Sequence, residues 1–338
     1  MKTKKKYSRV TLQEVAEHAG VSRATASLAV RNSQNISKAT RNKVLKSMTE
    51  LGYVYDRIAA NLRSQRSSTI GLIITDIANP FFSELLIGVH HALEKHGYTV
   101  VLGTTFDLDA KQDKLLSTML EHRVGGVILC PVSDSLKETI ERIKQWDIPI
   151  VHAVRELPDV SCDYVGIDYK IGAQMAVGHL IRKGHRRIAF LGGSSESSAW
   201  QERKKGYCTA LQQVGLQIDE ALVIENAVTR EGGKKALQQV LNDPNPPTAA
   251  FCFNDLVAFG VMQGLRDRGL VPSEDMAVVG LDDVQEASIS NPPLTTVSSF
   301  ARLIGTYAAD LLHQRIVDPL RERQRMILQP ELVVRDSS

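Results

Sequence analysis

The sequence predicts a small all-α helix-turn-helix domain at the N-terminus, followed by a two-lobed α/β core of parallel sheets flanked by helices. Three observations lead to this fold class. The segment "TLQEVAEHAGVSRATASLAV" (residues 11–30) holds two short amphipathic stretches around one glycine, the charge of the chain changes sign near residue 66, and two series of β-rich runs follow. With 338 residues the chain also exceeds what one hydrophobic core usually supports, so several domains are expected.

The first predicted helix begins at about Leu12 and ends at Gly20. Thr11 and Glu14 have the spacing of a capping box, in which each side chain accepts a hydrogen bond from a free backbone N–H at the helix start. Glycine at position 20 suits the left-handed conformation that often ends a helix. The hydroxyl of Ser22 can then cap a second helix, so a tight turn joins the two.

The second predicted helix has two unlike faces when its residues are projected at about 100° per residue. One face carries small residues that can pack against a neighbouring helix: Thr25, Ala26, Ala29 and Val30. The opposite face is short-chained and basic: Arg23, Ala24, Ser27, Leu28 and Arg31. A third helix, capped by Ser37 and ended by Gly52, is expected to bury Val44, Leu45, Met48 and Leu51. Three short helices with a tight turn after the first form a helix-turn-helix unit.

The charge of the chain is divided unevenly. Residues 1–66 carry 14 Lys and Arg against 4 Asp and Glu, whereas residues 67–338 carry 27 against 34. A basic arm on an acidic body is typical of a protein that binds a polyanion, because each phosphate that a basic residue neutralises releases counterions. The alternative interpretation is a small helical subdomain whose charges are only solvated.

The core is predicted to contain two similar α/β lobes, because short β-rich runs alternate with amphipathic helical stretches. The first series of runs comprises residues 69–75, 98–104, 125–130 and 149–154, and the second comprises residues 163–168, 187–192, 248–253 and 276–281. A proline-bearing joint near 291–297, a helix near 300–316 and a last strand at 325–334 imply that the chain crosses between the lobes more than once.

Several classes of protein are disfavoured. No apolar run reaches the ~18 residues of a membrane span, and "MKTKKKYSRV" lacks the apolar segment of a signal peptide, so we expect a cytoplasmic protein with no membrane partner. The sequence has no G-x-S-x-G elbow, Walker loop, H-E-x-x-H or G-x-G-x-x-G motif, so no enzyme and no cofactor are expected. The widely spaced cysteines Cys130, Cys162, Cys208 and Cys252 indicate buried thiols, with neither a disulfide framework nor a metal site.

Polar and aromatic residues follow several predicted strands, where ligands of open parallel sheets bind. They are Asp76, Asn79, Phe81 and Phe82 after the first strand, and Arg203, Asn254, Asp255, Asp282 and Asp283 in the second lobe. These residues are candidates to line a cleft. Taken singly, Asp and Asn pairs are also ordinary helix caps, an arginine is more often a solvated helix charge, and phenylalanines are often core.

Five segments of the chain, in order, resemble the lactose-repressor (LacI/GalR) family of bacterial transcriptional regulators. They are "TLQEVAEHAGVSRATASLAV" with "TRNKVLKSMTELGY", "IGLIITDIANPFFSELLIGV", "GHRRIAFLGG", "NDLVAFGVMQGLRDRGLVPSEDMAVVGLDD" and "PPLTTV". The resemblance covers essentially the whole chain. It implies a helix-turn-helix headpiece, a hinge helix and a two-lobed core similar to periplasmic sugar-binding proteins, working as a homodimer on a palindromic operator in double-stranded DNA.

The domain boundaries follow from the patterns and the resemblance together. The DNA-binding domain is expected over residues 1–55, the hinge helix and linker over 56–67, and the effector-binding and dimerisation core over 68–338. Within the core, lobe one is expected to comprise about 68–162 and 298–324, and lobe two about 163–292 and 325–338.

The resemblance also implies DNA-binding residues. Arg23, Ala24 and Leu28 fall on base-reading positions, and Ser22, Thr25, Ser27 and Asn32 fall near phosphates or bases. Further positions are Thr11, then Arg57 and Ala59 in the hinge segment "DRIAANLRSQ", and Leu62, which matches a leucine that wedges into the minor groove and kinks the DNA. Because Leu28 stands where the family usually has arginine, an apolar contact such as one to a thymine methyl is expected there.

The effector contacts implied by the resemblance are Phe82, Arg203, Asn254 and Asp282, to which Asp76 is added from its place after the first strand. Val154 stands where several sugar-responsive members have Asp. We therefore predict a transcriptional repressor whose operator affinity is controlled by a small ligand, first a sugar or sugar phosphate and second a nucleoside-like compound. The alternatives are a sugar- or nucleotide-acting α/β enzyme and a solute-binding protein with an accessory helical domain, and both leave the basic arm unexplained.

Overall fold

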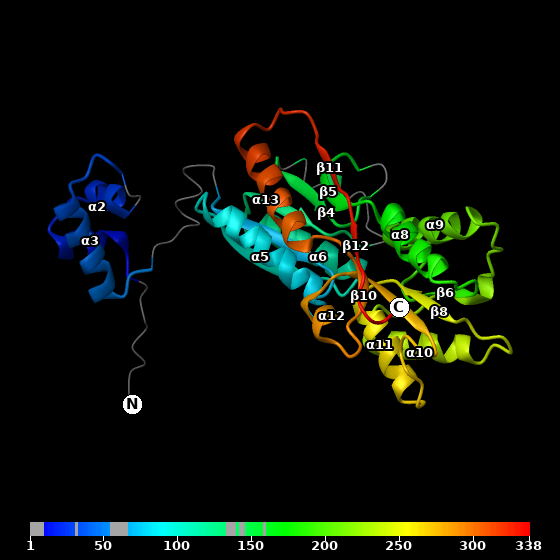
Figure 1. Ribbon diagram of the computed structural model, residues 1–338. Helices are drawn as coiled ribbons and strands as arrows, with labels where there is room; N and C mark the ends of the chain where they lie inside the picture. The colour runs from blue at the N-terminus through cyan, green and yellow to red at the C-terminus, as the bar shows by residue number, and fades with distance from the viewer. Residues whose placement is uncertain are drawn as a thin grey trace, which may run out of the picture. The chain divides into compact units, whose positions relative to one another are not determined.

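The chain forms two compact units, Met1–Arg66 and Ser67–Ser338 (Figure 1). The structure, a computed structural model, describes residues 10–30, 33–54, 67–132, 140–141, 145, 147–157 and 160–338. Apart from Ser67, the predicted hinge at residues 56–67 lies outside the described residues. The predicted DNA contacts at Asn32, Arg57, Ala59 and Leu62 lie outside them as well.

The described part of the N-terminal unit contains the three predicted helices. They are α1 (Leu12–Ala19), α2 (Arg23–Val30) and α3 (Lys38–Leu51). The predicted capping box starts α1: the Thr11 hydroxyl accepts a hydrogen bond from the Glu14 N–H (3.3 Å), and the Glu14 carboxylate accepts one from the Thr11 N–H (2.7 Å). Gly20 ends α1 with a φ of 61°, a left-handed conformation that only glycine adopts without strain, and so permits the tight turn to α2.

Small side chains let these three helices approach closely. Their buried core consists of Val15, Ala16, Ala19, Ala26, Ala29 and Val44. The prediction that α3 buries Leu45 is wrong, because this side chain is 44% exposed and Ser47 is buried instead. Positions 44, 47, 48 and 51 share one helix face, whereas position 45 is turned by about 100° from position 44.

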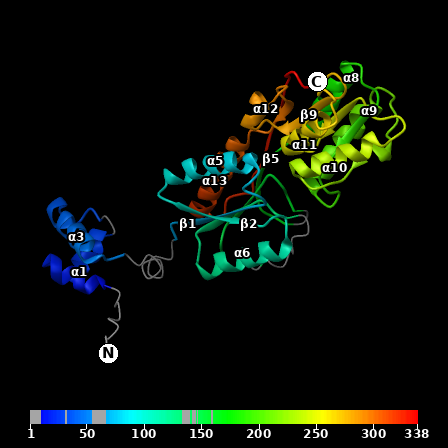
Figure 2. The same cartoon turned by 90° about the horizontal axis from the view of Figure 1, so that it is seen from below.

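Lobe one of the second unit is built on a six-stranded sheet with the order β11-β5-β4-β3-β1-β2, in which all the strands are parallel. The strands are β1 (Thr69–Ile74), β2 (Thr99–Thr104), β3 (Gly126–Leu129), β4 (Ile150–Ala153), β5 (Asp163–Ile167) and β11 (Arg325–Leu328). Helices α5 (Pro80–Glu94) and α13 (Ala301–Val317) cover one face, and α6 (Asp109–Glu121) covers the other (Figure 2). Burial on both faces explains why the central strands are continuously apolar.

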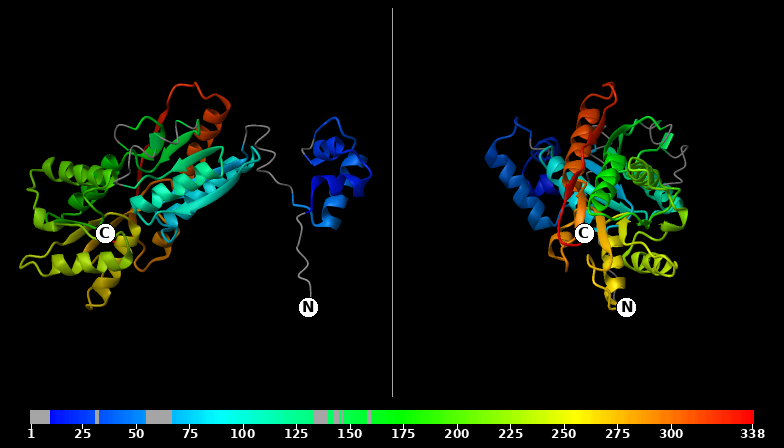
Figure 3. Two further views of the ribbon diagram at one scale, coloured as in Figure 1. Left: turned by 180° about the vertical axis from the view of Figure 1, so that it is seen from behind. Right: turned by 45° about the vertical axis from the view of Figure 1, so that its right-hand side comes forward.

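Lobe two is built on a second six-stranded sheet, with the order β12-β10-β9-β8-β6-β7. Its strands are β6 (Ile188–Leu191), β7 (Val223–Ile224), β8 (Ala249–Cys252), β9 (Ala277–Asp282), β10 (Thr295–Ser298) and β12 (Glu331–Val333), of which β12 runs antiparallel to β10. Its helices pack in pairs: α8 (Tyr169–Arg182) with α9 (Ser198–Gln212), and α10 (Arg230–Leu241) with α11 (Asp255–Arg266). A 3-10 turn (Glu220–Leu222) and α12 (Gln285–Ile289) complete the lobe, and Figure 3 shows both lobes from behind.

The predicted boundaries between the lobes are wrong at two strands. Residues 163–167 (β5) and 325–328 (β11) were expected in lobe two, but both belong to the sheet of lobe one, where β5 pairs with β4 and β11 pairs with β5. Buried Asp163 fixes this arrangement, because it accepts two hydrogen bonds from Arg315 of α13 (3.0 and 3.1 Å) and one from the Gln324 N–H (2.8 Å). The chain therefore crosses between the lobes after β5, after β10 and after β11.

Two other expectations concern the whole chain. Among the described residues, no helix has the length and apolar character needed to cross a bilayer. The four cysteines are free, but only Cys130 and Cys252 are buried, whereas Cys162 and Cys208 are partly exposed.

Candidate functional site

The N-terminal unit presents the start of α2 to solvent. The Ser22 hydroxyl accepts a hydrogen bond from the Thr25 N–H (3.1 Å) and so caps this helix. Arg23 and Ala24 in its first turn are exposed, whereas Ser27 and Leu28 are half-buried. A helix with an exposed arginine and a small neighbour in its first turn can approach base edges in a major groove.

Thr11 plays a different part from the α2 residues. Its hydroxyl and backbone N–H are both engaged with Glu14 in the capping box. This bonding fixes the N-terminus of α1, so Thr11 orients the helix pair whether or not it also contacts a phosphate.

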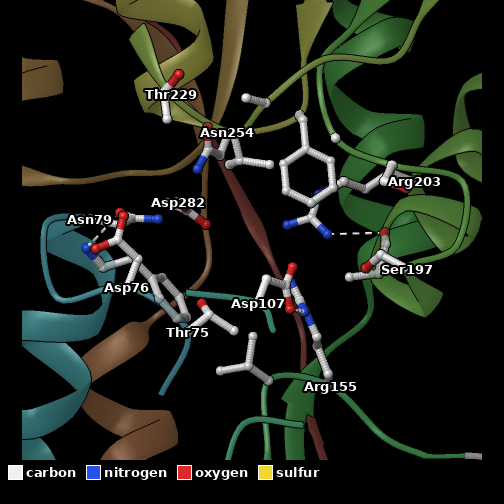
Figure 4. A pocket seen from close by; sticks show the side chains of 18 of the residues that line it. Thr75, Asp76, Asn79, Asp107, Arg155, Ser197, Arg203, Thr229, Asn254 and Asp282 are labelled. Atoms are coloured by element: carbon white, nitrogen blue, oxygen red, sulfur yellow. Dashed lines mark hydrogen bonds and ion pairs between the residues drawn. The ribbon is translucent and has the colours of Figure 1, made fainter. Parts of the chain in front are cut away.

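The core contains a cavity of about 580 Å³ beyond the carboxyl ends of the strands of both sheets (Figure 4). The five predicted effector residues all line it: Asp76, Phe82, Arg203, Asn254 and Asp282. They come from lobe one after β1 and from lobe two at α9, β8 and β9. Polar groups from two lobes around one partly apolar cavity are typical of a small-molecule site.

The lobe-one side of the cavity begins with the turn between β1 and α5. Asn79 caps α5 by accepting a hydrogen bond from the Phe81 N–H (3.1 Å), and Pro80 occupies the first helical position. This cap places Phe81 and Phe82 in the first turn, where their rings meet edge to face with centroids 5.1 Å apart. Asp76 accepts a hydrogen bond from the Ala78 N–H (2.9 Å), which orders the turn before the cap.

Arg203 is buried between two aromatic rings of the cavity. It is only 4% exposed, and its guanidinium carbon lies 4.0 Å from the ring centroid of Tyr169 and 4.2 Å from that of Phe253. Nη1 donates to the Ala199 carbonyl (3.0 Å), but Nε has no partner among the described residues. Burial lowers the pKa of Arg203, an effect that Tyr169 and Asp282 partly offset. A buried donor without a partner is ready to bind a ligand oxygen.

Asp282 ends β9 inside the cavity, with a φ of 132° that few non-glycine residues adopt. Burial raises the pKa of Asp282 well above its ordinary value, and the neighbouring Asp255 raises it further while Arg203 lowers it. Asp255 lies behind β9, where its carboxylate accepts hydrogen bonds from the Thr296 hydroxyl (2.5 Å) and the Val284 N–H (2.9 Å). A Cβ at Gly280 would lie 2.2 Å from the Asp255 carboxylate, so only glycine fits there.

Asn254 is a helix cap as well as a cavity residue. It accepts a hydrogen bond from the Val257 N–H (3.1 Å) at the start of α11 through its side-chain oxygen. Its amide group retains hydrogen-bonding capacity toward the cavity that it lines. Capping and ligand binding are therefore compatible roles for this residue.

Several lining residues were not predicted as effector contacts. They include Thr75, Phe106, Asp107, Arg155, Tyr169, Ser197, Glu225, Asn226, Thr229 and Phe253. Thr75 and Phe253 directly precede the predicted Asp76 and Asn254, so the rule on strand ends could have found them. Asp107 and Arg155 follow the ends of β2 and β4, so the same rule could have found them as well.

Comparison with known proteins agrees with this arrangement. The family model of periplasmic binding proteins and the sugar binding domain of the LacI family matches residues 67–334, and that of bacterial regulatory proteins, lacI family, matches residues 11–56. The HTH-type transcriptional repressor CytR of Escherichia coli (strain K12) is 32% identical over 338 residues, which cover 100% of this chain and 99% of that protein.

Two solved structures extend the likeness to the fold. The lac repressor dimer bound to operator and the anti-inducer ONPF has 28% sequence identity and a TM-score of 0.83, over 98% of this chain and 99% of that chain. The complex of the transcriptional regulator CelR with cellobiose has 33% identity and a TM-score of 0.74, over 98% of this chain and 100% of that chain.

Within the family, the sequences of residues 179–193 and 203–211 resemble a maltose-system repressor. This finer likeness is a prediction from the sequence. At the level of the family, the two matched models together account for nearly the whole chain. The chain belongs to the LacI family of bacterial regulatory proteins, and it is a ligand-controlled, DNA-binding transcriptional regulator and not an enzyme.

Proposed function

We propose that this regulator is a repressor whose effector is a neutral, hydroxyl-rich ring compound, namely a sugar, bound in the cavity between the lobes. The observation that carries the proposal is the gathering of Arg203, Asn254 and Asp282 around one cavity with aromatic walls. Sugar hydroxyls both donate and accept hydrogen bonds, while the ring carbons present an apolar face, so these groups suit a sugar. The cellobiose bound to CelR supports a sugar as the ligand class.

The charges of the cavity favour a neutral sugar over a sugar phosphate. The lining carries four carboxylates, those of Asp76, Asp107, Glu225 and Asp282, against the guanidinium groups of Arg155 and Arg203. Arg155 is paired with Asp107, which leaves Arg203 with the carboxyl groups of Asp76, Glu225 and Asp282 in the lining. A phosphate would add further negative charge to a partly desolvated site.

A nucleoside is the second candidate. Five aromatic side chains line the cavity: Phe81, Phe82, Phe106, Tyr169 and Phe253. Such rings can stack on a base while the polar groups bind the attached ribose. The sugar ranks first because two of these rings, Tyr169 and Phe253, are already occupied by Arg203.

On the DNA side, we propose that Arg23, Ala24 and Leu28 read bases, while Ser22, Thr25 and Ser27 lie along the backbone with Thr11 nearby. Two copies bind a palindromic operator as a homodimer, because a headpiece this small gains useful affinity only when a second one is held beside it. The operator-bound lac repressor dimer supports this assembly. The protein then acts in the cytoplasm, where bacterial DNA lies.

The ligand class is tested on the full chain by thermal shift against neutral sugars, their phosphates and nucleosides, and by operator binding with and without each ligand. We expect a neutral sugar to raise Tm and to change the affinity for DNA upstream of the gene. Asp282→Asn should weaken that ligand by about tenfold, because a buried ligand group that loses its hydrogen-bond partner costs about 1–3 kcal/mol.

Asp267→Asn is the matched control, because Asp267 is an exposed carboxylate of lobe two that pairs with Lys234 and does not line the cavity. It should leave ligand affinity unchanged. Stronger stabilisation by a sugar phosphate than by any neutral sugar would contradict the proposed class. Equal binding to the parent and Asp282→Asn would contradict the proposed site.

A further inference from the structure

The loop after β2 holds two consecutive residues in a left-handed conformation. Phe106 and Asp107 have φ values of 51° and 58°, and Val154 at the end of β4 has a φ of 69°. This region is uncommon for residues other than glycine, and it is an outlier for a β-branched side chain such as valine. Strain of this kind persists only where surrounding contacts impose it, and it concentrates at ligand clamps.

An ion pair joins the two loops of lobe one in which these residues lie. The Asp107 carboxylate accepts hydrogen bonds from Arg155 Nη1 (2.6 Å) and Nη2 (3.1 Å), a bidentate geometry. The Arg155 side chain is 11% exposed and that of Asp107 is 44% exposed, so the pair joins a buried guanidinium to a carboxylate at the surface. Figure 4 shows the two side chains next to each other in the wall of the cavity.

Phe106 directly precedes the paired Asp107. It lines the cavity although its side chain is 54% exposed, and the Lys111 ammonium lies 4.3 Å from its ring centroid. An aromatic ring kept in solvent by a strained backbone gains burial when the apolar face of a ligand covers it.

Arg155 stands between two cavities. It lines the cavity of about 580 Å³ and also a second one of about 690 Å³, which extends along β5 and β11 past Tyr164 and Arg325. Val154, Tyr169 and Ala199 likewise line both. Because Asp107 holds the Arg155 guanidinium at both nitrogen atoms, this side chain cannot move aside without breaking the pair.

We propose that Asp107 and Arg155 form a partition between the two cavities and so determine ligand specificity. The pair confines the ligand to the first cavity, under Phe106, and excludes ligands large enough to extend into the second cavity. This inference rests on the proposed function, because it assigns ligand size at the same site. Breaking the pair opens the second cavity to part of a larger ligand, such as the second sugar ring of a disaccharide.

A thiol reports on the partition without any ligand. Cys130, directly after β3, is 1% exposed and lies close enough to Arg155 and Asp107 for both charges to act on its pKa, which burial raises to about 12. In the full chain, we expect Asp107→Asn to speed N-ethylmaleimide labelling of Cys130, and Asp107→Gly to speed it by about tenfold. Both replacements tolerate the left-handed backbone, but asparagine keeps one acceptor for Arg155 and glycine keeps none.

Two controls separate opening of the partition from general loosening. Buried Cys252 in lobe two should keep its labelling rate, since only global unfolding would expose both thiols. Asp109→Asn removes the same charge from an exposed position in the first turn of α6 that does not line the cavity, and should leave Cys130 protected. Labelling of Cys130 in Asp107→Gly at the parental rate would overturn the partition.

Glucose and cellobiose serve as probes of ligand specificity, and their affinities are measured by thermal shift and titration. We expect the affinity ratio of disaccharide to monosaccharide to rise about tenfold in Asp107→Gly and to stay at the parental value in Asp109→Asn. Faster labelling of Cys130 with an unchanged affinity ratio would overturn the role of the ion pair in ligand specificity. If no sugar or nucleoside binds the parent, the proposed function fails, while the labelling result still decides whether the pair is a partition.

Discussion

Arginine serves the N-terminal unit and the core in opposite surroundings. Arg23 is exposed in the first turn of α2, whereas Arg203 is 4% exposed and fixed between two aromatic rings. Arg23 must be ordered and desolvated when DNA binds, so much of its contribution to the binding free energy is available only with the correct base. Arg203 is already ordered and desolvated by the fold, so its ligand gains a preorganised donor.

The two units differ equally in how they are stabilised. The buried core of the N-terminal unit consists of six small residues, whereas the second unit holds two extensive clusters on the faces of its sheets. Their charges differ in sign as well, with 14 Lys and Arg against 4 acidic residues in one and 27 against 34 in the other. The comparison indicates that the small unit supplies DNA affinity while the large unit supplies stability and ligand binding.

The largest expected effect comes from separating the units. Residues 67–338 alone should remain folded and keep the ligand-induced rise in Tm, because the core has its own sheets and cavity. They should lose operator affinity by at least about 1,000-fold, the usual ratio of specific to non-specific binding, since their net charge is negative. Fluorescence anisotropy on operator DNA at fixed salt measures the loss, with the full chain as reference. Retained operator binding by this fragment would contradict the inference that the small unit supplies the DNA affinity.

A smaller effect is expected from Arg23→Ala. If Arg23 binds a guanine through two hydrogen bonds, its loss should weaken operator binding by about 1–3 kcal/mol and relax the preference at one position of each half-site. Selection from a randomised operator library measures the preference. Lys46→Ala on α3 is the control, because Lys46 is exposed and pairs with Glu50 four residues on. Equal losses for Arg23→Ala on operator and random DNA would make Arg23 a phosphate contact.

Local patterns explain why the N-terminal unit could be predicted well. The capping box, the left-handed Gly20 and the exposed Arg23 all depend on residues within four positions of one another. Leu45 shows the limit of such reasoning, because the choice between adjacent helix positions depends on where the neighbouring helices lie. The two-lobed fold was predictable for a similar reason, since strand and helix periodicities are local.

The parts that could not be predicted depend on contacts between distant residues. Nothing in the apolar run at 163–167 shows which sheet it joins, and Arg315, 152 residues later, fixes that choice. Asp107 and Arg155 are 48 residues apart, and neither adjoins a recognisable motif. Four of the five predicted effector residues came from the family resemblance and Asp76 from its place after a strand, whereas the pairing of Asp107 with Arg155 became visible only once the loops were placed.

The smallest expected effect concerns pH, to which the two units respond in opposite directions. In the core, burial raises the pKa of Asp255 to about 7, against hydrogen bonds from Thr296 and Val284 that lower it. In the N-terminal unit, hydrogen bonds from Thr11 lower the pKa of Glu14. A raised carboxyl pKa means that the folded core keeps a proton that the unfolded chain releases above about pH 4.

The contribution of Asp255 to the stability of the core should therefore fall as the pH rises from about 4 to about 7 and stay constant above. The contribution of the Glu14 cap to the stability of the N-terminal unit is instead lost as the pH falls. Asp255→Asn isolates the first effect, because an amide can accept from the Val284 N–H and donate to the Thr296 hydroxyl without titrating. We expect the parent to lose on the order of 1 kcal/mol relative to the variant between pH 6 and pH 7, a change of about 2–4 °C in Tm. Calorimetry of both proteins at pH 5, 6 and 7 measures the difference, and Asp267→Asn serves again as the exposed control. A difference that stays constant with pH would mean that Asp255 remains ionised in the folded core, and the contrast between the two units would then rest on charge and burial alone.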